Sequence, residues 1–110
     1  MTTTKWEQGL ALFRAGHYFE THEEWEIAWK EAPREERDFY QGMVHLTVAL
    51  YQAGRDNKVA AHSQMRKARK RLSTYGAQYN EVPLALLVPA VEQAVERRLT
   101  GDRSCLDFGI

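Results

Sequence analysis

The sequence predicts an all-α protein, a compact bundle of about five helices around a central third helix. Apolar residues recur every three or four positions through most of the chain, and Gly, Asn, Asp and Pro separate these segments. The hydrophobic fraction of 44% and the aromatic fraction of 11% are typical of a packed globule. At 110 residues, we expect one domain over 1–110, with a core at about 4–100 and a tail at 101–110.

The first helix is expected over about 4–15. Thr4 is a good N-cap residue, and Glu7 stands at the spacing of a capping box. Gly16 then supplies a C-cap or a turn. The apolar stripe of this segment contains Trp6, Leu10 and Phe13.

The second helix is expected over about 17–31, and Pro33 ends it. One stripe of this helix contains Tyr18, Phe19, His22, Trp25, Glu26 and Trp29. This spacing predicts that two tryptophans and a His/Glu pair are buried together.

The third helix, at about 35–55, is apolar on two sides and is therefore expected to be central. A break at 54–57 precedes a fourth helix at about 58–75, whose narrow stripe of small residues favours close packing. The last helix is predicted from Val88, Val91, Val95 and Leu99, with Pro89 in its first turn. The alternative is that Pro83 opens a separate short turn.

Charge and cysteine content exclude several classes of protein. Fifteen basic and fifteen acidic residues cancel, so the whole chain has no net field that attracts nucleic acid or an anionic membrane. Cys105 is the only cysteine, which excludes an internal disulfide and fits a reducing cytoplasm. No apolar run approaches the roughly 20 residues that span a bilayer, so we expect no membrane partner and a cytoplasmic location.

Two polar pairs are predicted to meet inside the bundle. His22 and Glu26 are four residues apart on the second helix, and Gln41 and His45 repeat this spacing on the third. Helices joined by a short link usually pack antiparallel, which brings the pairs together. The first interpretation is structural: Glu26 accepts hydrogen bonds from a histidine, from Gln41 and from an indole such as that of Trp29.

The alternative interpretation is a divalent metal held by His22, Glu26 and His45, with water in an open position. In that case Glu23 would activate the water of a metal-dependent hydrolase, although His22-Glu23-x-x-Glu26 lacks the second histidine of the H-E-x-x-H motif. We favour a binding or scaffold module over an enzyme. Its polar cluster is then structural or recognises a small polar ligand, and no cofactor is expected.

Two stretches resemble a known family. They are Gly16-His-Tyr-Phe-Glu-Thr-His-Glu-Glu-Trp-Glu-Ile-Ala-Trp29 and Phe39-Tyr-Gln-Gly-Met-Val-His-Leu-Thr-Val-Ala-Leu50, with the turn at 57–61. Over about residues 6–75 the chain is similar to domain-of-unknown-function family 309. The resemblance implies a small helical bundle and brings no established activity. The hallmark positions that it matches are His22, Glu23, Glu26, Trp29, Gln41 and Gly42, while relatives often carry a glutamine at the position of His45.

A basic run stands on the fourth helix. Its members are Arg66, Lys67, Arg69, Lys70 and Arg71. We interpret it as a solvated helix face, since no aromatic residues interleave it as stacking platforms for bases. A nucleic-acid-associated accessory protein that uses this run as an anion patch is the third functional alternative. The N-terminal half is the more acidic and the C-terminal half the more basic, which suggests a homo-oligomer joined through opposite faces.

Overall fold

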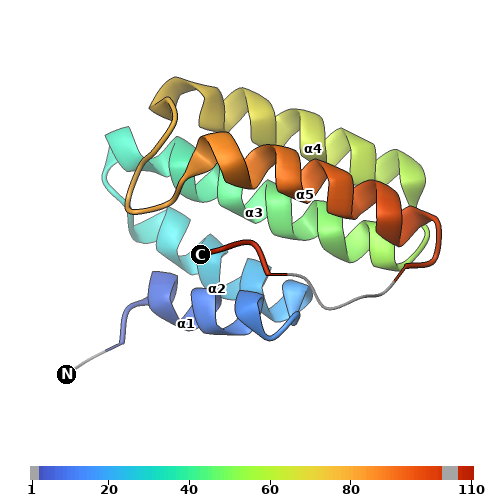
Figure 1. The fold of residues 1–110 in the computed structure, drawn as a ribbon. Helices are drawn as coiled ribbons and strands as arrows, with labels where there is room; N and C mark the ends of the chain where they lie inside the picture. Colours follow the sequence, from blue (N-terminus) through green and yellow to red (C-terminus); the bar gives the residue numbers. More distant parts are fainter. Residues whose placement is uncertain (1–2, 103–106) are drawn as a thin grey trace.

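The structure is a computed structural model that describes residues 3–102 and 107–110. The described residues form five α-helices and one short 3₁₀ helix, which confirms the predicted all-α bundle (Figure 1). The elements are α1 (Lys5–Arg14), α2 (Tyr18–Glu31), α3 (Arg34–Gly54), α4 (Lys58–Leu72), η1 (Ser73–Tyr75) and α5 (Leu84–Leu99).

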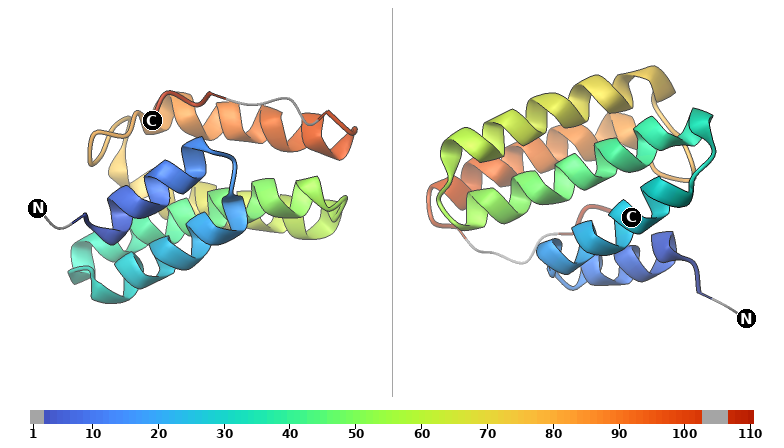
Figure 2. Two further views of the ribbon diagram at one scale, coloured as in Figure 1. Left: turned by 90° about the horizontal axis from the view of Figure 1, so that it is seen from below. Right: turned by 180° about the vertical axis from the view of Figure 1, so that it is seen from behind.

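Helix α3 is central, as predicted, because it packs against α2, α4 and α5. In Figure 1 α5 lies in front of α3 and α4, and α1 lies beside α2. Seen from behind, α2, α3 and α4 together form one broad side of the molecule (Figure 2). This side is covered by no further helix of the described chain.

An aromatic cluster joins α1, α2 and α3. Trp25 is fully buried and stacks on Trp6 at a centroid distance of 4.8 Å and on Phe13 at 5.6 Å. Its indole N–H donates to the Trp6 carbonyl over 3.1 Å. Gly9 leaves the space for this ring, because a Cβ at that position would lie against the indole of Trp25. Apolar burial on this scale is the main stabilising term of a small domain.

The helix ends confirm the predicted punctuation. Thr4 caps α1 by accepting the Glu7 amide over 3.1 Å, and Asn57 caps α4 in the same way. Gly16 has a φ of 81°, the left-handed conformation that favours glycine after a helix. The helix boundaries at Thr4, Gly16 and Asn57 therefore follow from the local sequence.

The predicted start of the last helix is wrong, because α5 begins at Leu84 and contains Pro89 in its interior. The N–H groups of Leu86 and Leu87 donate to the Pro83 carbonyl, so Pro83 opens the helix itself rather than a separate turn. Pro89 removes one hydrogen bond, the one to Ala85. Both residues are exposed, so water replaces this bond at small cost.

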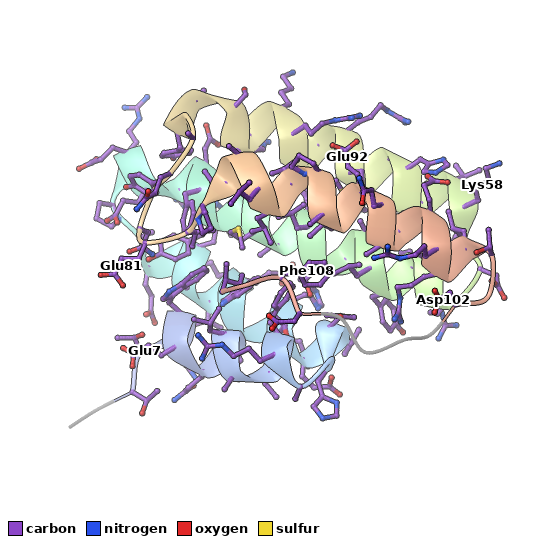
Figure 3. The ribbon with its side chains drawn as sticks, in the orientation of Figure 1. Glu7, Lys58, Glu81, Glu92, Asp102 and Phe108 are labelled. Carbon is purple, nitrogen blue, oxygen red and sulfur yellow. The ribbon has the colours of Figure 1, made fainter. Side chains whose placement is uncertain are left out.

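The end of the chain returns to α1. Phe108 packs against Phe13 at a centroid distance of 5.5 Å, and Arg14 Nε donates to the Ile110 carbonyl over 2.7 Å. Figure 3 labels Phe108 between the ribbons of α1 and α5. Cys105 lies outside the described residues.

Candidate functional site

The predicted polar residues belong to α2 and α3, two of the helices of the broad side. On α3, the Thr47 hydroxyl donates to the Tyr18 carbonyl of α2, while His45 binds Gln64 of α4. Gln41 and His45 are half-buried. We define the polar face as the side chains of His22, Glu26, Trp29, Gln41 and His45.

The expectation that Glu26 is buried is wrong, since its side chain is 48% exposed. The residues of α2 that face the core are Tyr18, Thr21, Trp25 and Ala28. Trp25 fixes the rotation of the helix, and Glu26, one position later, is turned by about 100° from it. Thr21 is tolerated in the core because its hydroxyl donates to the His17 carbonyl over 2.8 Å.

His22 lies at the border between the core and the polar face, with 21% of its side chain exposed. Its Nδ1 is 2.8 Å from the Phe19 carbonyl oxygen, so Nδ1 carries the hydrogen and donates. Its Nε2 lies 3.5 Å from Glu26 Oε1. The histidine is thus oriented by the backbone of its own helix, and its other nitrogen points along the polar face toward Glu26.

His45 pairs with a residue that the sequence analysis missed. Its Nδ1 lies 2.6 Å from Gln64 Oε1 of α4. Burial lowers the pKa of His45 below 6.5, and the positive charges of Lys67 and Arg71 lower it further, while the hydrogen bond that His45 Nδ1 donates to Gln64 raises it. In the sequence, Gln64 is recognisable only as a polar residue next to the apolar stripe of the fourth helix. Spacing along one helix does not reveal hydrogen-bonded pairs between two helices.

Trp29 is half-buried, and the Arg37 guanidinium lies over its ring at 5.2 Å from the centroid. The indole that donates a hydrogen bond in the core is that of Trp25, and its acceptor is a backbone carbonyl rather than Glu26. The polar residues therefore do not form the Glu26-centred network that we expected.

The proposed metal ligands are not grouped. In residues 3–102 and 107–110, no set of three or more His, Cys, Asp or Glu side chains has the arrangement of a metal site. His22, Glu26 and His45 are all among the described residues, and Glu23 is exposed on α2. The geometry gives the metal-dependent hydrolase no support.

A small cavity of about 120 Å³ opens beside His22, between α2 and α3. Its lining residues are Tyr18, Phe19, His22, Val48, Tyr51 and Gln52. Phe19 is 44% exposed, and its ring lies 5.3 Å from that of Tyr51 and 5.1 Å from that of His22. The sequence analysis placed Phe19 in the core, because it shares a helical stripe with Trp25.

The basic run projects from α4, and two of its five members have carboxylate partners. Arg69 binds Glu92 of α5 over 2.7 Å, and Arg71 binds Asp38 of α3 over 2.8 Å. Arg66, Lys67 and Lys70 are exposed. These ion pairs tie α4 to its neighbours and reduce the charge offered to an anion.

The fold and this side of the molecule define a small all-helical domain with a half-exposed polar face. The chain matches the family described as a domain of unknown function (DUF309) over residues 6–64, and it belongs to that family. The matched region contains the whole polar face and Gln64, but not the basic run. No curated protein and no solved structure matches the chain. None of the described helices is long and apolar enough to cross a membrane.

Proposed function

We propose that this chain is a protein-binding module that holds a segment of a partner protein on its polar face. The observation that carries the proposal is the exposure of the polar residues. Glu26 is half-exposed, and Gln41, His45 and Trp29 are half-buried, so the core does not need them as partners. Such side chains of α2 and α3 are accessible to a partner.

The size of the adjoining cavity favours a protein partner over a small molecule. Its volume of about 120 Å³ is well below the roughly 300–1,000 Å³ of typical small-molecule sites. It suits one apolar side chain of a partner, packed against Phe19 and Tyr51. An apolar anchor with polar contacts around it is the common anatomy of a protein interface.

The side chains of the polar face offer both donors and acceptors. The Glu26 carboxylate accepts, and the Gln41 amide donates and accepts. These groups fit a partner segment that exposes backbone N–H groups or hydroxyls on either side of its apolar anchor. On this proposal four of the hallmark positions serve recognition: His22, Glu26, Trp29 and Gln41.

Site-directed photo-crosslinking tests the proposal. A photoreactive phenylalanine analogue at Gln52, which lines the cavity, should give a discrete protein adduct in cells. The same analogue at Arg66, an exposed residue of α4, is the matched control and should give none. The Gln52 adduct should disappear in the Glu26→Ala variant and in the Phe19→Ser variant. A missing adduct at Gln52, or one that persists in both variants, would overturn the proposal.

A further inference from the structure

A second and larger cavity lies at the opposite end of α2 from the small one. Its volume is about 410 Å³, within the range of small-molecule sites. Its wall combines the start of α1, the last turn of α2, one residue of α3 and one residue of the turn at 79–82. Four segments distant in sequence therefore meet at one cleft, which the polar face does not include.

Two aromatic rings form a corner in this cleft. Trp6 and Tyr40 both line it, with their centroids 5.9 Å apart and their planes at 70°. Trp6 is held in place by its stack on Trp25 and by the hydrogen bond from that indole to its carbonyl. Two ring planes at a steep angle are the arrangement that surrounds an organic cation with electron-rich faces.

The charge of the cleft is negative. Its ionisable lining residues are Lys5, Glu7 and Glu31. The Lys5 ammonium lies 3.0 Å from the buried Oε2 atom of Glu24, and this ion pair neutralises the cation. Glu24 itself does not line the cleft. Glu7 offsets the partial positive charge at the start of α1. The carboxylate of Glu31 remains, and the C-terminal end of α2 adds partial negative charge.

The turn beside the cleft is held in a costly conformation. Asn80 lines the cleft with a φ of 51°, and Glu81 follows with a φ of 63°. Left-handed backbone is sterically unfavourable for a glutamate, and such strain concentrates at functional sites. Figure 3 shows Glu81 and Glu7 at the same end of the molecule, so the turn adds a further carboxylate near this end.

We propose that this cleft binds a small alkylammonium ion, with Trp6 and Tyr40 against its alkyl groups and Glu31 as the counter-charge. The two rings supply attraction to a poorly hydrated cation. The carboxylates exclude anions of the same size. This site is separate from the polar face, so one can fail without the other.

Tetramethylammonium chloride is the probe, and tert-butanol is the neutral control of similar shape. Titration at constant ionic strength, followed by the N–H resonances of the folded protein, should give saturable shifts at Trp6, Tyr40 and Asn80 with tetramethylammonium only. Glu31→Gln should weaken binding by about threefold or more, and Tyr40→Leu by a similar factor. Glu20→Gln, an exposed glutamate at the other end of α2, is the matched control and should bind as the wild type does.

Three outcomes would overturn the site: equal shifts with tert-butanol, no saturation with tetramethylammonium, and equal affinity in Glu31→Gln and Glu20→Gln. Glu31 is exposed, so its substitution preserves the fold even if Tyr40→Leu does not.

Discussion

The inner and outer sides of α2 differ in the burial of their side chains and in the hydrogen bonds that these side chains make. The inner side carries Trp25 and Thr21, both fully buried, with every polar atom of the indole and the hydroxyl hydrogen-bonded. The outer side carries Glu26, which is 48% exposed, and His22, which is bound mainly by its own helix. One position along the chain therefore separates a residue that stabilises the fold from one that is available for binding.

This difference shows what a helical stripe does and does not determine. The stripe that contains Tyr18, Trp25 and Trp29 is wide enough for several rotations of the helix. The large indole of Trp25 packs against Gly9, and this contact selects one of these rotations. The predictions below test this selection from the largest expected effect to the smallest.

Trp25→Ala should destabilise the protein by about 3–5 kcal/mol, because it removes a fully buried aromatic side chain from the junction of three helices. Trp29→Ala, the matched change on the outer side, should cost clearly less. Urea denaturation followed by circular dichroism measures both free energies of unfolding. Equal losses would mean that the two tryptophans share the core after all.

Gly9→Ala should destabilise the protein by about 1–3 kcal/mol, because the added methyl group collides with the Trp25 indole. Alanine is otherwise the better helix former by about 1 kcal/mol, so helix propensity alone predicts the opposite sign. The midpoint of thermal unfolding distinguishes the two. A higher midpoint for Gly9→Ala would contradict the claim that the contact between Gly9 and the Trp25 indole fixes the rotation of α2.

Glu24→Gln should cost about 0.5–1 kcal/mol, and Glu26→Gln should cost less. Glu24 is the less exposed of the two, at 27%, and pairs with Lys5 of α1 over 3.0 Å. A buried His22/Glu26 pair, as expected from the sequence, would give the opposite order. Paired urea titrations decide the order, and a larger loss for Glu26→Gln would restore a buried network around that residue.

Much of the fold follows from the sequence, because caps and breakers act locally. Thr4, Gly16 and Asn57 each end or begin a helix through contacts with the next few residues. Pro89 was misplaced because a proline late in the second turn of a helix is tolerated where both it and its would-be acceptor are exposed. The local sequence does not show that solvent compensates for the lost hydrogen bond.

The candidate site is less predictable, since its geometry depends on contacts between helices. Spacing identified His22 with Glu26 and Gln41 with His45 as neighbours on their own helices. It did not identify Gln64 as the partner of His45, nor Glu24 as the partner of Lys5. Both contacts depend on how two helices are rotated and crossed, which spacing along one helix does not determine.

The stability of the protein should fall as pH decreases through about 6.5. The pKa of folded His45 lies below this value because of burial and the charges of Lys67 and Arg71, so the unfolded chain binds the proton more readily. Below the folded pKa this contribution stops changing. Urea titrations at neutral and mildly acidic pH should show a weaker dependence for His45→Gln than for the wild type. Identical dependences would contradict the desolvated position of this histidine.

The double variant Glu26→Ala/Gln41→Ala tests most directly the claim that the polar face serves recognition rather than stability. Its free energy of unfolding, from urea denaturation at pH 7, should lie within about 1 kcal/mol of the wild type, since substitutions outside the buried core usually change stability by about 0.5 kcal/mol or less each. A loss well above 2 kcal/mol would contradict the account, because only a buried hydrogen-bonded network gives so large an effect.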